Sequence, residues 1–249
     1  MNRHTKKLTA VFIAALFCFG FSDAALAQQE LTGVPESGAL SARVIQLFLI
    51  VTVLSLAPGA AMMVTCLPFM IVVFSIMRQA IGLQQAPPNM LIMSLALFLT
   101  YFVMEPVFAD AWASGIQPML DGNITEEQAF VRTLLPFEAF MQSRVSPVAL
   151  ETLMDVAPVR EGATPSDKTP ISVLIPAFML SEIQHAFEIG FVIFLPFLII
   201  DLAVASVLMA MGMMMVPPAI VSLPFKLAFF VLANGWVKIA GAVVRGYSG

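Results

Sequence analysis

Long apolar runs separated by short polar turns divide this chain into four hydrophobic arms and one polar insert. The arms cover residues 44–77, 90–109, 171–216 and 219–244, and the insert covers residues 110–170. Apolar stretches of about 20 residues are long enough to cross the hydrocarbon core of a bilayer as helices. The pattern therefore predicts an all-α membrane protein with two helical hairpins, residues 44–109 and 171–249, joined by the insert.

Proline pairs mark the turns of both predicted hairpins. Pro87-Pro88 lies in the polar turn 78–89, and Pro217-Pro218 separates the third arm from the fourth. Proline lacks a backbone donor and cannot continue a helix easily, so a pair of prolines favours a turn. Further prolines interrupt the long arms at Pro58-Gly59, Pro68, Pro176 and Pro196. The prediction is therefore two long Pro-kinked hairpins.

The first and third arms are longer than a simple membrane span. The 34 residues of the first arm would reach about 50 Å as a helix, whereas the hydrocarbon core is about 30 Å thick. Tilt absorbs only part of this excess. We expect parts of these arms to leave the bilayer, kink at the prolines or pack against other subunits; a plain four-span bundle is the alternative.

Residues 1–27 have the pattern of a signal peptide. Basic residues precede an apolar run at 8–21, which ends near the small residues of Ala25-Leu26-Ala27. This order is typical of a secretory signal with cleavage after Ala27, and an uncleaved anchor helix is the alternative. The mature chain would then begin outside the cytoplasm, with residues 28–43 as a periplasmic segment.

This start fixes the expected topology of the arms. The first arm runs inward, so the turn carrying Arg78, Pro87 and Pro88 faces the cytoplasm, in weak agreement with the positive-inside rule. The second arm returns outward and places the insert in the periplasm.

The insert is expected to hold a small helical domain. Thr125 is a plausible N-cap for a helix running to about Ser143, and residues 158–170 read as a loop. Its apolar side chains are expected to pack in that domain or at an interface; they are Leu134, Leu135, Phe137, Phe140 and Met141.

Composition agrees with a membrane protein and excludes a nucleic-acid partner. Hydrophobic residues make up 59% of the chain, charged residues only 11%, and the mean hydropathy is +0.93. Without residues 1–27 the chain has nine basic and fifteen acidic residues, a net charge of −6, which repels phosphates. Cys18 leaves with the signal peptide, so Cys66 is expected to be a buried structural thiol with no disulfide partner.

Ionisable side chains inside the arms must face protein or water, because each costs about 2.5 to 3.5 kcal/mol in lipid. They are Glu182, His185, Glu188, Asp201, Lys226 and Lys238. A Glu-His-Glu set at steps of three could hold a metal or serve an intramembrane enzyme, but the set drifts around the helix and lacks further ligands. We therefore expect no metal, no cofactor and no catalytic residue, and favour a hydrated or ion-paired helix face.

Asp201 and Lys226 lie on opposite sides of the Pro217-Pro218 turn. Two pairings are open, one within the hairpin and one between neighbouring copies of the chain, and we favour the pairing between copies. Glu182 and Glu188 are candidates for similar pairs. An ion or proton transporter subunit using Asp201 and Lys226 is an alternative function.

A methionine-rich segment spans residues 209–215. Five of its seven residues are methionine: Met209, Met211, Met213, Met214 and Met215. Methionine is unbranched and flexible, so it suits surfaces that repack around different partners. Gly212 and the prolines that follow favour a bent segment or loop. Lipid-facing or core methionines are the alternative for this segment taken alone.

Two blocks of this sequence resemble the FliP family. The first contains RQAIG at 78–82, QAPPN at 85–89 and LALFLT at 95–100. The second contains IPAFMLSEI at 175–183, AFEIGF at 186–191, FLPFLIIDL at 194–202 and SLPFKL at 222–227. The blocks cover most of the chain outside the signal peptide and the insert. The injectisome homologues, the SctR branch, share this plan and are a further alternative.

The resemblance implies a core subunit of the flagellar type III protein export gate and not an enzyme. Several copies, a pentamer in the family, would assemble in a helical ring with FliQ and FliR, next to FlhB and above FlhA, with FliO assisting assembly. Unfolded flagellar proteins would pass through the channel across the bacterial inner (cell) membrane, at the flagellar basal body. The methionine-rich segment would project into this channel as a gasket that opens when a substrate strand inserts.

Overall fold

A computed structural model describes residues 37–83, 86–157, 169–213 and 215–248. These residues form helices joined by short turns, without a strand among them, so the all-α prediction is confirmed. The predicted signal peptide, most of segment 28–43 and most of the predicted loop 158–170 lie outside the described residues.

The first helix, α2 (Ser37–Met63), is apolar around its circumference. Residues 43–52 are exposed along its length, and Thr52 and Ser55 donate their hydroxyls to carbonyls of the same helix, at 2.7 Å each. The predicted interruption at Pro58-Gly59 is wrong, because both residues lie inside α2. The break comes after Met63, and Pro68 then sits in the first turn of the next helix, where a missing N–H costs nothing.

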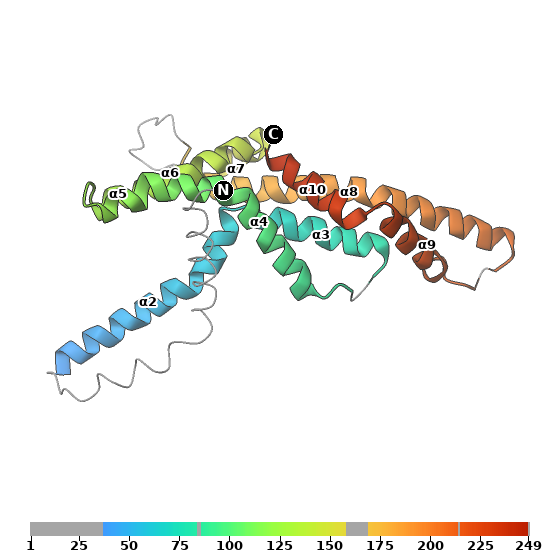
Figure 1. Ribbon diagram of the computed structural model, residues 1–249, viewed down its shortest axis with the longest axis horizontal. Coiled ribbons are helices and arrows are strands. Elements are labelled where there is room, and N and C mark those ends of the chain that lie inside the picture. The colour runs from blue at the N-terminus through green and yellow to red at the C-terminus, as the bar shows by residue number, and fades with distance from the viewer. Residues whose placement is uncertain (1–36, 84–85, 158–168, 214, 249) are drawn as a thin grey trace. The chain divides into compact units, whose positions relative to one another are not determined.

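Helix α3 (Leu67–Ile81) lies at the centre of the unit formed by residues 57–249 (Figure 1). It packs most extensively along α8 (Ile171–Ala210) and also contacts α4 (Asn89–Ala111). Gly190 allows this close approach, since a Cβ there would meet the side chain of Ile76. Large side chains of α3 are completely or almost completely buried, including Phe69, Met70 and Phe74.

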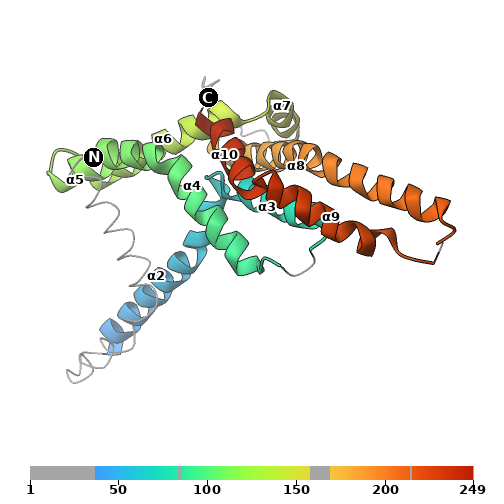
Figure 2. The ribbon, with the colours of Figure 1, turned by 45° about the vertical axis from the view of Figure 1, so that its right-hand side comes forward.

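The second predicted hairpin is formed by α8, α9 (Pro218–Leu232) and α10 (Gly235–Ser248). Helices α9 and α10 return toward the start of α8, as Figures 1 and 2 show, and α9 packs against α8. The bend between α9 and α10 is 61° and falls at Asn234, which has a left-handed φ of 51°. Helix α8 begins where the apolar pattern begins and ends at Ala210, so the rest of the arm leaves the helix, as Gly212 and the following prolines favour. It continues through Pro176 and Pro196, so the predicted kinks stay a prediction.

The second arm is longer than its apolar pattern predicts. Helix α4 continues without a break through a π-helical turn, η1 (Trp112–Ile116), into α5 (Gln117–Leu120), so the predicted end near Ala109 is wrong. Ser114 donates its hydroxyl to the carbonyl of Asp110 at 2.7 Å, which satisfies these polar groups within the helix. Polar residues here therefore do not end the helix.

The insert packs onto the long helices and forms no separate module. Helix α6 (Glu126–Arg144) contacts α4, η1 and α8, and α7 (Pro147–Val156) contacts α8. The Thr125 cap is confirmed, because its hydroxyl accepts from the Gln128 N–H at 3.4 Å. Of the five apolar side chains expected to pack, Met141 is buried, Phe137 and Phe140 are half-buried against the core, and Leu134 and Leu135 are exposed.

Two helical stretches among the described residues are long and apolar enough to cross a membrane. They are Asn89–Leu120, with 32 residues, and α8, with 40; the bent pair α9 and α10 is a third if it counts as one span. At about 1.5 Å per residue these two stretches reach roughly 48 and 60 Å, well beyond the hydrocarbon thickness of about 30 Å. The expectation of an overlong arm is therefore met by the third arm, α8. The first arm, also expected to be overlong, is divided between α2 and α3, and the overlong α4–α5 stretch was not expected.

Candidate functional site

The methionine-rich segment forms the turn between α8 and α9, and backbone hydrogen bonds define its start. The Gly212 N–H donates to the Met209 carbonyl at 3.0 Å, and the Met213 N–H donates to the Leu208 carbonyl at 2.9 Å. Gly212 adopts a left-handed φ of 75°. This is a Schellman motif, in which a left-handed glycine ends the helix and satisfies its last carbonyls.

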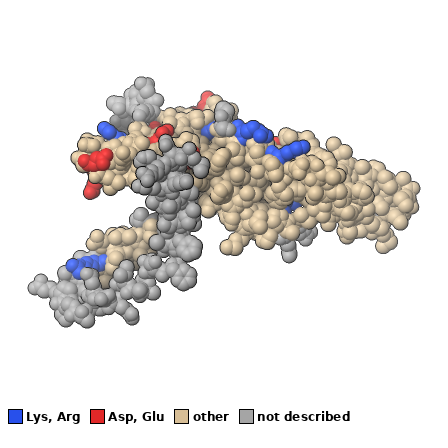
Figure 3. Space-filling model, viewed as in Figure 1, with Lys and Arg blue, Asp and Glu red and all other residues tan. Residues whose placement is uncertain are grey.

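The methionine side chains described at this turn are largely exposed. Met209, Met211, Met213 and Met215 are 61%, 65%, 47% and 97% exposed, and Met214 lies outside the described residues. No charged residue occurs between Asp201 and Lys226 in the sequence, and in Figure 3 the end of the molecule formed by α8 and α9 shows neither sign of charge. We call residues 209–216 the methionine tip.

A polar cluster, here called the clasp, joins α8 to α9 next to the tip; it consists of Asp201, Ser222 and Lys226. The Lys226 ammonium donates to one oxygen of the Asp201 carboxylate at 2.6 Å, and the Ser222 hydroxyl donates to the other at 2.5 Å. The Lys226 side chain is 7% exposed and that of Asp201 30%. Of the two pairings left open by the sequence, the single chain has the one within the hairpin, and the favoured pairing between copies stays a prediction.

Glu182 belongs to a second buried cluster, which also lies within one chain. Its carboxylate, 0% exposed, accepts from the Tyr247 hydroxyl and lies 3.7 Å from the Arg144 Nε atom. Sequence reasoning missed both partners. A buried carboxylate signals that a partner must exist, but 65 residues separate Glu182 from Tyr247, and local spacing does not identify a contact at that distance.

The other two members of the Glu-His-Glu set have different neighbours. The Nδ1 atom of His185 lies 3.1 Å from the Ser181 carbonyl, and the exposed Glu188 accepts from the Gln184 amide at 2.9 Å. The three side chains therefore do not converge. Among the described residues no group of three or more His, Cys, Asp or Glu side chains is arranged to hold a metal.

Arg78 organises the turn between α3 and α4. Its guanidinium donates to the Pro87 carbonyl at 3.3 Å and to the side-chain oxygen of Asn89, the first residue of α4. Gly82 ends α3 with a left-handed φ of 90°, and Pro88 is the residue that precedes α4. The predicted turn residues are thus brought together in a compact capping structure, to which Asn89 is added.

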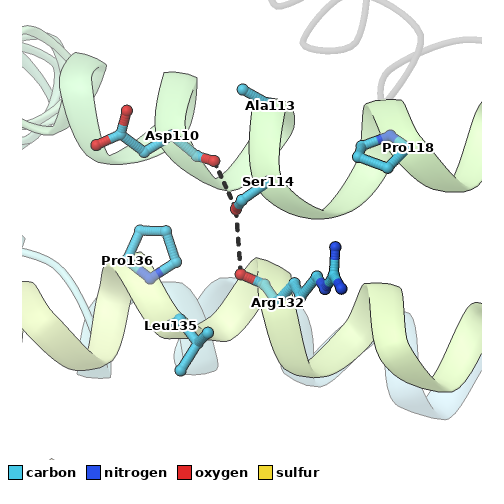
Figure 4. Close-up of a pocket in the computed structure, with 7 residues that line it drawn as sticks. All are labelled: Asp110, Ala113, Ser114, Pro118, Arg132, Leu135 and Pro136. Atoms are coloured by element: carbon cyan, nitrogen blue, oxygen red, sulfur yellow. Dashed lines mark hydrogen bonds between the residues drawn. The ribbon is translucent and has the colours of Figure 1, made fainter. Parts of the chain in front are cut away.

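A shallow groove lies between the η1 segment and α6. It encloses about 620 Å³ and is lined by Asp110, Ala113, Ser114, Pro118, Arg132, Leu135 and Pro136. Figure 4 shows Ser114 between the two helices, where its hydroxyl also donates to the Arg132 carbonyl at 3.2 Å, while the Asp110 and Arg132 side chains point to opposite sides. The groove has no nucleophile paired with a base.

Fold and site together define a helical membrane protein with an exposed, apolar hairpin tip. The model of the FliP family matches residues 50–243. The chain therefore belongs to the FliP family, a family of flagellar export components and not of enzymes.

Curated relatives match along most of their length. The chain is 45% identical to a flagellar biosynthetic protein FliP of Agrobacterium fabrum, over 96% of this chain and 98% of the relative. It is 47% identical to the protein of that name from Caulobacter vibrioides, over 94% and 88%. It is 40% identical to the one from Bacillus subtilis, over 82% and 91%.

Proposed function

We propose that this chain is a channel-forming subunit of the flagellar protein export gate, and that its methionine tip closes the channel at rest. The observation that carries the proposal is the exposure of the tip. Four described methionines are 47% to 97% exposed at the end of a hairpin without charges. Burying one such side chain is worth about 1.5–3 kcal/mol, so the tip has a strong tendency to be covered.

In this proposal, the methionine tip of each copy is covered by the tips of neighbouring copies. Several copies in a ring would bring their tips together at the axis, where each tip covers the next and excludes water. FliQ and FliR would complete the ring, FlhB and FlhA would lie next to it, and FliO would assist its assembly. The parts of α8 and of the α4–α5 stretch that exceed the bilayer thickness would form walls of this assembly, with the insert on the periplasmic side of the inner membrane.

The Schellman motif suits a gate of this kind. Because backbone hydrogen bonds end α8, no methionine side chain is needed to hold the turn, and each remains free to change rotamer. An unfolded substrate strand could then displace the thioethers, which repack around side chains of different size. The energy for transport would come from other components of the apparatus.

Replacement of the methionines by alanine tests the gate. The variant Met209→Ala/Met211→Ala/Met213→Ala keeps the helix end and removes most of the side-chain volume. We expect the complex to assemble in normal amount and the membrane to become leaky, measured as potassium efflux from membrane vesicles containing the complex. Assembly is followed by the mass of the detergent-extracted complex.

Matched methionines on another helix provide the control. Met90 and Met93 on α4 are 82% and 44% exposed, and Met90→Ala/Met93→Ala should assemble and stay tight. Normal assembly with unchanged efflux in the tip variant would reject the gate. Equal leakage in both variants would show that the effect is not specific to the tip.

A variant of the clasp residues distinguishes the gate from the transporter alternative. If Asp201 and Lys226 carried ions or protons, Asp201→Asn/Lys226→Met would abolish export while the complex stayed assembled. If the clasp is only structural in a gate subunit, every complex that this variant assembles should still export protein.

A further inference from the structure

Glu188 is an exposed carboxylate on an apolar face of α8. Its neighbours one helical turn away include Phe191 and Val192, which are 63% and 64% exposed, and Gln184, whose amide donates to it at 2.9 Å. Glu188 forms no ion pair with another described residue. A carboxylate on the outside of a membrane-length helix needs water or a positive charge beside it, because lipid does not stabilise it.

Arg245 is an exposed cation on the outer face of α10. Its guanidinium folds back over Gly241, and its Nη1 atom lies 3.4 Å from the position that a Cβ would take there. The sequence from residue 202 to residue 249 contains no acidic residue, and Arg245 forms no ion pair with another described residue. Helix α10 therefore presents a positive charge that its own limb of the hairpin does not neutralise.

The two charges lie at the same level along the hairpin. Helix α10 returns along α8 (Figures 1 and 2), and Tyr247 of α10 donates its hydroxyl to Glu182 of α8. Counted from this contact, Glu188 lies six residues along α8 and Gly241 lies six residues back along α10. Because both helices rise by about 1.5 Å per residue, Glu188 is level with Gly241, over which the Arg245 guanidinium lies.

The two charges point to different sides of the chain. An α-helix turns by about 100° per residue, so Glu188 points about 120° away from the direction in which Glu182 meets α10. By the same count Arg245 points about 160° away from Tyr247, and thus away from α8. A single chain therefore carries the two charges at one height without bringing them together.

We propose that Glu188 of one copy forms an ion pair with Arg245 of the next copy, and that this contact joins neighbouring copies in the ring. The proposal rests on the ring of copies in the proposed function and names two residues of its interface. The partner of Glu188 is thus a second copy of this chain.

The geometry of a ring explains why height and direction both matter. Two different patches on one chain make a head-to-tail interface, which forms a ring if the rotation between copies closes. Rotation about an axis parallel to the hairpin leaves heights unchanged, so the two charges must start at the same level. Arginine suits the contact, because its planar guanidinium binds a carboxylate through two parallel hydrogen bonds.

Charge reversal in two co-expressed full-length chains tests the pair. Glu188→Lys alone and Arg245→Glu alone each place like charges at every contact between copies, so each should yield about tenfold less multi-copy complex than the parent. In a ring that alternates the two chains, each contact is either native or fully reversed, so co-expression should restore the complex. The measurement is the amount recovered through an affinity tag on the Arg245→Glu chain, and its mass after detergent extraction.

Two controls show whether the effect belongs to this pair. The parent chain as partner, which differs from the Glu188→Lys chain only at that residue, should recover clearly less tagged complex. Lys238→Glu reverses a second exposed cation of α10, about 10 Å from Arg245 along the helix, and should reduce the complex much less than Arg245→Glu. Equal recovery with both partners, or equal loss from both reversals on α10, would overturn the pair.

Cross-linking tests the same contact without introducing a charge. Glu188→Cys and Arg245→Cys chains, co-expressed and treated with a short bismaleimide, should give a cross-linked dimer on a denaturing gel. Either chain alone should stay a monomer, because Cys66 is buried and a head-to-tail contact does not place one position beside itself. If the mixed chains give no dimer while the parent complex contains several copies by mass, the pair is wrong and the ring stands. A parent complex with a single copy would overturn both.

Discussion

At the scale of single residues, buried ionisable side chains in this chain find partners on helices that are distant in sequence. Lys226 meets Asp201 across the hairpin, and Glu182 meets Tyr247 across 65 residues. In a chain with so few charges, each contact both satisfies a buried group and fixes the register of two helices. Removal of one partner should therefore affect the packing of whole elements.

Lys226→Met tests the contribution of the clasp. The variant keeps the apolar stem but leaves the Asp201 carboxylate with the Ser222 hydroxyl, which should lower the free energy of unfolding by about 1–3 kcal/mol. The thermal unfolding midpoint of the detergent-solubilised protein measures this loss. Lys238→Met is the control, because Lys238 is exposed and should change stability by less than about 0.5 kcal/mol. Equal shifts in both variants would show that the clasp adds nothing.

At the scale of helices, the apolar pattern predicted those elements whose ends are encoded locally. Helix α8 begins at Ile171 as expected, directly after Pro170, and Thr125 caps α6 through its own hydroxyl. Both signals are read from neighbouring residues. The turn at Pro87-Pro88 follows for the same reason.

Local patterns failed where packing decides the outcome. Pro58 does not interrupt α2, because one missing hydrogen bond is tolerated in an apolar helix, and Asp110 does not end α4, because the π-helical turn carries the helix on. The partners of Glu182 were missed because hydrophobic periodicity identifies faces and not the element that covers each face. For Asp201, the sequence supplied Lys226 as the partner, but local spacing does not decide between pairing within the hairpin and pairing between copies.

The crossing of η1 and α6 depends on Gly115. A Cβ there would lie 2.8 Å from the Thr133 nitrogen and 2.9 Å from the Ala129 carbonyl oxygen. These are backbone atoms and cannot rotate away, so Gly115→Ala should cost about 1–3 kcal/mol of stability, seen as a lower thermal unfolding midpoint.

Gly59→Ala is the matched control for this prediction. Gly59 lies inside α2 with nothing within 4 Å of its ideal Cβ position, so alanine should be neutral or stabilise the helix by up to about 1 kcal/mol. If Gly115→Ala were as stable as Gly59→Ala, the close crossing of η1 and α6 would be wrong.

At the scale of the whole molecule, the described helices expose a large amount of apolar surface. The exposed large side chains include Phe98, Phe102, Phe187, Phe191 and Phe225, on three helices of the unit 57–249. Surface of this kind is stable only against lipid or other subunits. The composition and the two membrane-length stretches agree with this environment.

Fractionation tests the membrane environment directly. We expect the protein to remain in the membrane pellet after an alkaline carbonate wash and to enter the supernatant only with detergent, as detected by immunoblotting. Glu126 and Glu127 at the start of α6 are exposed, so Glu127→Lys at this polar end should not change the distribution. Release by carbonate alone would show that the apolar helices are not held in a bilayer.

The absence of charge between Asp201 and Lys226 has a consequence for the response of the tip to voltage. A transmembrane potential does work only on charge that it moves, at about 2.3 kcal/mol per elementary charge for 100 mV. The side chains of the tip carry none, so the field exerts no direct force on them. Any voltage dependence of the tip's position must therefore be transmitted mechanically, from charged groups elsewhere in the chain or in its neighbours.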